Sequence, residues 1–84
     1  MRIYLQSPVS ETGIIRFVHI ILQEDLMGGW SVIIERGQQG SPGSVKKHYF
    51  ENRQEAIDAA INLRDKDIRR GYSIAFVQGD APDV

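Results

Sequence analysis

One segment of this chain, residues 52–71, carries a complete helix signal, and no other apolar run does. Asn52 is a residue type that caps a first helical turn, and Glu55 follows it at the spacing of a capping box. Gly71 stands where a helix commonly ends in a left-handed conformation. We therefore expect one helix between these residues. Its apolar positions, at helical spacing, are Ala56, Ile57, Ala60, Ile61, Leu63 and Ile68.

The other apolar runs are short, rich in β-branched residues and bounded by turn residues, which is typical of strands. We expect strands at residues 2–6, 14–24, 30–36, 44–50 and 72–77, the first of them a short edge strand. Short connections favour antiparallel pairing. The sequence therefore predicts an α+β fold, an antiparallel β-sheet of about four to five strands with one α-helix packed on it.

The length limits the chain to one domain with one core. We expect a single domain over residues 1–84, with its core at about 14–77 and a flexible acidic tail at 78–84.

Charge and composition exclude several classes of protein. The net charge is −1, so any contact with nucleic acid depends on local clustering of cations. The chain has no cysteine, which excludes disulfides, thiolate zinc sites and cysteine nucleophiles. No apolar run approaches the roughly 20 residues that span a bilayer, and the first residues do not resemble a signal peptide. We expect a cytoplasmic protein without membrane contact.

The segment after the third expected strand is a candidate anion site. Gly37, Gly40 and Gly43 with Pro42 allow backbone N–H groups to converge on an oxyanion. Arg36 at the root of this loop has a planar guanidinium suited to a phosphate. The alternative is a hairpin tip whose glycines serve the turn alone. The segment is not a P-loop, because the Gly-Lys-Ser/Thr ending is missing.

Cations follow this loop and recur at the end of the helix. Lys46 and Lys47 are neighbours on a strand, so they point to opposite faces. Arg69 and Arg70 either contact phosphate or form a solvated face that complements the helix dipole. The residues predicted to contact nucleic acid are Arg36, Gly37, Gln38, Gly40, Lys46, Lys47, Arg69 and Arg70.

Nothing in the sequence indicates catalysis. His19 and His48 lie on separate strands and have no carboxylate at ligand spacing, so we expect no metal and no cofactor. No nucleophile elbow or carboxylate pair is present, and we expect a non-enzyme. Aromatic residues are expected mainly in the core, including Tyr49 and Phe76.

The order of these segments resembles the WGR domain family, over roughly residues 14–76. The best-matched parts are residues 25–30 (DLMGGW), residues 50–56 at the start of the helix, and Lys66 with Gly71 and Tyr72. The resemblance is to a small single-domain bacterial member, a group mostly without an assigned function. In poly(ADP-ribose) polymerases the family's domain contacts DNA near a break. The resemblance therefore implies a WGR-like fold and a nucleic-acid role.

The chain departs from the family at the signature that names it. The pattern Trp-Gly-Arg-hydrophobic-Gly falls on residues 36–40, where Arg36 replaces the tryptophan, Gln38 the arginine and Gln39 the hydrophobic residue. In the family, the tryptophan and arginine lie at or beside the nucleic acid. Stacking by that tryptophan is not carried over to this chain.

The leading functional hypothesis is a small binding module with weak, largely sequence-independent contacts to nucleic-acid phosphates, DNA being favoured. Replacing both Lys46 and Lys47 is then expected to reduce the salt dependence of binding by roughly two units. The alternative is a protein–protein interaction module that has lost nucleic-acid binding. Either is compatible with a monomer or a weak homodimer formed through an exposed edge strand.

Overall fold

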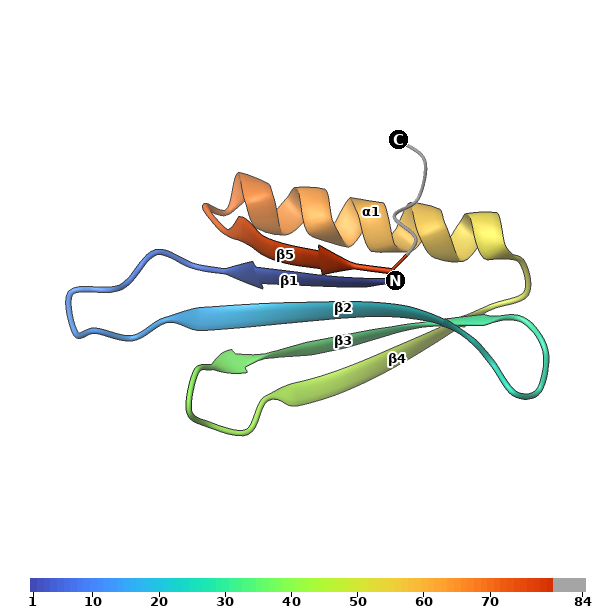
Figure 1. Ribbon diagram of the computed structural model, residues 1–84, viewed down its shortest axis with the longest axis horizontal. Helices are drawn as coiled ribbons and strands as arrows, with labels where there is room; N and C mark the ends of the chain where they lie inside the picture. The colour runs from blue at the N-terminus through green and yellow to red at the C-terminus, as the bar shows by residue number, and fades with distance from the viewer. Residues whose placement is uncertain (80–84) are drawn as a thin grey trace.

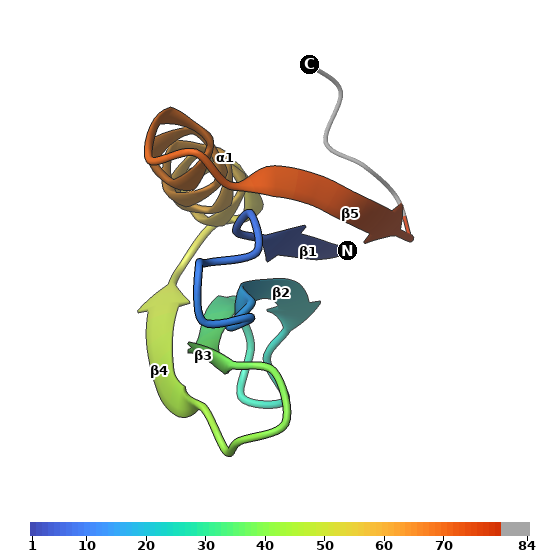
Figure 2. The same ribbon diagram turned by 90° about the vertical axis from the view of Figure 1, so that its left-hand side faces the viewer.

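The computed structural model describes residues 1–79, which form five strands and one helix. The elements are β1 (Arg2–Gln6), β2 (Arg16–Glu24), β3 (Trp30–Gln38), β4 (Ser44–Phe50), α1 (Arg53–Arg69) and β5 (Ser73–Gln78). All strands pair antiparallel in the order β4-β3-β2-β1-β5, and α1 packs across one face (Figures 1 and 2). The predicted α+β fold is confirmed.

β1 is an interior strand, so its prediction as an edge strand was wrong. Its Ile3 and Leu5 are 2% and 0% exposed and belong to the core, which therefore extends beyond residues 14–77. The reason is that the chain returns after α1 and pairs β5 with the second side of β1.

Gln78, which was assigned to the tail, is the last residue of β5. The rest of the predicted tail, residues 80–84, lies outside the described residues.

The ends of α1 follow the predicted signals. The Asn52 side-chain oxygen accepts a hydrogen bond from the Glu55 amide at 2.8 Å. At the other end, Gly71 has a φ of +98°, a left-handed conformation that glycine adopts without strain. The amide of Tyr72 then donates to the backbone oxygen of Asp67 at 3.0 Å and directs the chain into β5. Local capping residues therefore fix both ends of the helix.

The core lies between α1 and one face of the sheet. Ala56 and Ala60 are fully buried, and their small side chains let the helix approach the strands closely. The buried core consists of Ile3, Leu5, Val18, Ile20, Leu22, Val32, Ile34, Ala56, Ile57 and Ala60. Because residues alternate along a strand, the second face of the sheet carries the other set of side chains. No described helix covers that second face (Figure 2).

Tyr49 and Phe76 are 54% and 47% exposed, so their prediction as core residues was wrong. Both project from the face without a helix, where Tyr49 lies opposite Ser31 and Phe76 lies opposite Tyr4.

Among the described helices, none has the length and apolar character needed to cross a membrane.

Candidate nucleic-acid interface

A pocket of about 270 Å³ opens on the helix side of the sheet, between β4 and α1. In Figure 2, β4 lies at the end of the sheet away from β5, and its arrowhead points towards α1, which follows it in the chain. The pocket is lined by Ile34, Arg36, Ser44, Lys46, His48 and Leu63. We call these six residues the β4–α1 pocket.

Strand register explains why these residues meet. Ile34 points from β3 towards the helix, and in the antiparallel ladder Lys46 stands opposite it on β4. Two residues further on, Arg36 stands opposite Ser44 on the same face. Alternation along two paired strands therefore brings Arg36 and Lys46 together, although ten positions separate them in the sequence.

The pocket combines an apolar floor with cationic walls. Ile34 is buried, and Leu63 of α1 is half-buried against the core. Lys46 is exposed and forms no ion pair within residues 1–79. An unpaired ammonium beside a guanidinium and a serine hydroxyl can bind an oxyanion.

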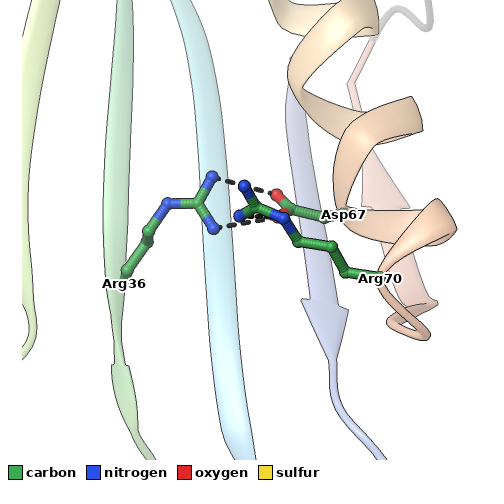
Figure 3. Close-up of polar contacts among 3 residues, drawn as sticks. All are labelled: Arg36, Asp67 and Arg70. Carbon is green, nitrogen blue, oxygen red and sulfur yellow. Dashed lines mark hydrogen bonds and ion pairs between the residues drawn. The ribbon is translucent and has the colours of Figure 1, made fainter.

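Arg36 holds the sheet to the end of the helix (Figure 3). Its Nη1 and Nη2 donate to Oδ1 and Oδ2 of Asp67 at 2.9 and 3.1 Å, which is a bidentate pair. Nη1 of Arg70 lies 3.8 Å from the same Oδ1. The Asp67 side chain is 0% exposed and the Arg36 side chain is 36% exposed. Part of the Arg36 side chain therefore stays exposed and lines the pocket, while its charge is paired with Asp67.

Asp67 is the residue that sequence reasoning missed. It follows Ala56, Ala60 and Leu63 on the helix at spacings of four, three and four residues, so it lies on the inward side of α1. A carboxylate at an inward position requires a cation, because burial of an unpaired charge is costly. That spacing is a signal that could have predicted the ion pair with Arg36.

Lys47 lies on the opposite face of the sheet. Its Nζ is 3.5 Å from Oδ2 of Asp25, and it stands opposite Ile33 rather than facing the helix. The pKa of Asp25 is lowered, first by the Met27 amide and then by the Ser31 hydroxyl, with a smaller effect from Lys47. Lys47 is therefore part of a turn-bracing contact and not of the β4–α1 pocket.

The glycines of the loop have structural roles. A Cβ on Gly37 would lie 2.9 Å from the Gly43 Cα and 3.3 Å from Cε1 of Phe17, so the close approach of the strands requires glycine there. Gly40 has a φ of +84° at the tip. These observations favour the interpretation of the loop as a turn.

Two of the loop amides already have backbone partners. The Gln39 amide donates to the Ile15 oxygen at 2.9 Å, and the Ser41 amide donates to the Gln38 oxygen at 3.1 Å. Gln38 itself ends β3 opposite Arg16. The amides of Gln39 and Ser41 are therefore committed to the turn rather than open to an anion.

The remaining predicted residues divide between the pocket and the solvent. Arg70 meets Arg36 at Asp67, beside the pocket, whereas Arg69 is exposed in the last turn of α1 and does not line it. The structure thus brings together Arg36, Lys46 and Arg70 and separates them from Lys47.

The two histidines lie on opposite faces. His48 lines the β4–α1 pocket, and His19 lies on the face without a helix, where its ring meets those of Tyr4 and Phe76 edge-on. Nε2 of His19 is buried without a hydrogen-bond partner among the described residues, and burial is the main cause that lowers its pKa. Within residues 1–79, no three side chains of the metal-binding types form a group that could hold an ion.

Comparison of the chain with protein-family models, curated proteins and solved structures finds no match. The resemblance to the WGR domain therefore stays a prediction from the sequence.

Proposed function

We propose that this chain is a small non-catalytic module that binds nucleic acid, DNA being favoured, through phosphate contacts at the β4–α1 pocket. One observation supports the proposal above all: Arg36, Lys46 and His48 line the same open pocket, together with Ser44, which stands opposite Arg36 in the ladder. The sequence resemblance to WGR domains points to the same class of partner.

The local charge supports an anionic ligand despite the net charge of −1. Arg36, Lys46 and Arg70 supply three positive charges beside one carboxylate, that of Asp67. A net charge of +2 therefore remains at the pocket and directly beside it, with His48 not counted. On duplex DNA each neutralised phosphate contributes about 0.9 to the slope of log affinity against log salt. We expect a slope of about −2, typical of weak binding that does not depend on sequence.

The adjacent lysines provide a matched test. The sequence alone predicted that Lys46 and Lys47 both contribute, but only Lys46 faces the pocket. We expect Lys46→Ala to reduce the slope by about one unit, whereas Lys47→Ala leaves it unchanged. The measurement is binding of a short nicked or overhanging DNA duplex at several salt concentrations, with NMR titration to locate the shifts.

Three results would contradict this function. They are affinity that does not respond to salt, equal effects of the two lysine variants, and a spectrum unchanged at high DNA excess. Shifts at Arg36, Ser44 and Lys46 that are reversed by salt would support it. Both variants replace exposed side chains, so thermal unfolding of each should match that of the parent chain and exclude a folding defect.

A protein-interaction module is the second candidate, and the turn between β2 and β3 favours it. Leu26 and Met27 are 102% and 91% exposed at its tip. The turn is nevertheless braced, because Asp25 accepts hydrogen bonds from the Met27 amide at 3.0 Å and from the Ser31 hydroxyl at 2.9 Å. A rigid turn that exposes two apolar side chains is suited to an apolar pocket of a partner protein.

The test of this candidate is a double variant, Leu26→Ser with Met27→Ser. A partner retained after nuclease treatment, identified and shown to bind the purified parent chain stoichiometrically, should lose binding to the variant. Unchanged binding to the variant would contradict the role of the tip. The Lys46→Ala variant is the control, because it alters the β4–α1 pocket and leaves the tip intact.

A further inference from the structure

β5 occupies the edge of the sheet but has the composition of an interior strand. Its sequence, SIAFVQ, contains no charged residue, and all six residues are exposed. The other edge strand, β4, carries Lys46, Lys47 and His48. Charged side chains on an edge strand discourage pairing with another chain, and β5 lacks that protection.

Apolar side chains project from both faces of β5. Val77 stands opposite Ile3 and therefore lies on the helix side, and Phe76 stands opposite Tyr4 on the second face. Ile74, Phe76 and Val77 are 43%, 47% and 46% exposed. Strands that are apolar on both faces are typical of the interior of a sheet, where a neighbour on each side shields them.

Phe76 also ends a row of parallel rings that crosses three strands. The rings of Phe17 and Tyr4 are 5.8 Å apart with an angle of 7° between their planes, and those of Tyr4 and Phe76 are 5.3 Å apart with an angle of 4°. On β2 and β1 each ring has a neighbour on the next strand. On β5 the outer side of the Phe76 ring faces the free edge, where a further ring could stack.

We propose that a second copy of this chain pairs its β5 antiparallel with β5 of the first, so that two five-stranded sheets join into one. The contact is isologous, because one strand pairs with itself across a twofold axis. Such pairing brings the two Phe76 rings together and continues the row of rings from one copy into the other. It also covers Ile74 and Val77 on the helix side.

Charge favours a second copy as the partner. β5 has no charge to repel its own copy, and the whole chain carries only −1. The outer backbone groups of β5 are open, since no backbone hydrogen bond beyond the β1 ladder reaches Ser73–Gln78 within the described residues. The lysines on β4 oppose a second edge contact, so the assembly stops at two copies.

A bulge limits the strength of the contact. The register between β1 and β5 shifts after Tyr4, and Ala75 has no partner in the ladder. Bulges interrupt pairing and increase the local twist of a strand. With a short, bulged strand as the interface, we expect a weak dimer that forms as the concentration rises.

The test is the mass of the full chain in solution from about 10 µM to about 1 mM, the range of weak association. The expected mass rises from 9.5 kDa towards twice that value. Phe76→Lys on β5 should abolish the rise. Val45→Lys is the matched control, because Val45 is a 62% exposed apolar residue on the other edge strand, β4. A mass of 9.5 kDa throughout, or equal effects of the two variants, would overturn the proposal.

A second measurement locates the contact without disturbing the ring row. The chain has no cysteine, so Gln78→Cys provides a single site for a nitroxide label. A labelled copy mixed with an unlabelled ¹⁵N copy should broaden the amide signals of β5 in the ¹⁵N copy. Broadening confined to β4 or to the Leu26–Met27 tip would overturn the proposal. If Phe76→Lys does not fold, Val77→Lys replaces it and should also abolish the rise in mass.

Discussion

The buried ion pair between Arg36 and Asp67 predicts an asymmetric response to substitution. Replacing Arg36 with methionine leaves the fully buried carboxylate of Asp67 with only the Arg70 guanidinium, 3.8 Å away. Replacing Asp67 with asparagine instead leaves Arg36, whose side chain is 36% exposed and can be hydrated. The arginine substitution should therefore destabilise the fold more than the aspartate substitution.

The geometry gives the size of each effect. Removing one partner of a buried pair costs about 3–5 kcal/mol, and we expect Arg36→Met near the lower end because Arg70 remains close to Asp67. A hydrogen bond to a charged group contributes about 1.5–3 kcal/mol, and hydration of the partly exposed Arg36 side chain reduces the loss for Asp67→Asn to about 2 kcal/mol. Replacing both partners with apolar residues, Arg36→Met with Asp67→Leu, should cost less than either single change.

The assay is urea unfolding of the parent chain, both single variants and the double variant. A domain of this length has a stability of about 4–12 kcal/mol, so the Arg36→Met variant loses a large part of it. Each kcal/mol lowers the melting temperature by about 4–8 °C. Equal losses below about 1 kcal/mol, the size of an exposed pair, would refute the reasoning. So would a double variant whose loss equals the sum of the single losses, since the pair would then contribute no coupling.

Further predictions concern pH and the β2–β3 turn. The pKa of His19 is lowered mainly by burial, so the unfolded chain takes up a proton at a higher pH than the folded one. The free energy of unfolding should therefore fall as the pH drops through about 6.5. His19→Gln should remove this loss in unfolding curves between pH 7 and 5. The pKa of Asp25 is lowered mainly by the hydrogen bond that its carboxylate accepts from the Met27 amide. The ionised carboxylate therefore stabilises the fold above a pH of about 3.9, and this contribution is lost as the pH falls below that value. Asp25→Asn should flatten the acid limb of the same unfolding curves. Gly28 and Gly29 both have a positive φ, of +89° and +77°. A Cβ added to Gly28 would meet nothing within 4 Å, whereas a Cβ added to Gly29 would lie 2.7 Å from Cζ of Tyr49. Gly28→Ala should therefore cost about 1 kcal/mol of backbone strain and Gly29→Ala at least about 2 kcal/mol, and equal losses in thermal unfolding would contradict the clash.

The parts of the fold that depend on local chemistry could be predicted from the sequence. Asn52 and Gly71 act through their own turns, so both ends of α1 followed from residue type alone. The position of β1 depends instead on β5, which follows it by more than sixty residues, and no local pattern reports that pairing. The exposure of Tyr49 and Phe76 likewise depends on the single helix covering only one face of the sheet.

The candidate site shows the same division. Alternation along β4 predicted that Lys46 and Lys47 point in opposite directions, and the ladder with β3 confirms it. Which lysine faces the helix depends on the strand register, which one chain does not reveal. The role of Arg36 depended on Asp67, 31 positions away, and the helical spacing that points to this partner was overlooked.

The interior position of β1 has a consequence for synthesis of the chain. β1 leaves the ribosome first among the strands, and 66 residues separate its end from the start of its partner β5. The strands β1 to β4, each paired antiparallel with the next, and α1 can form while the second edge of β1 still has no partner. Translation is slow relative to hairpin and helix formation, so the nascent sheet exposes this edge for seconds. During that interval β1, with its apolar residues Ile3 and Leu5, offers the largest binding surface to a chaperone or to a neighbouring nascent chain.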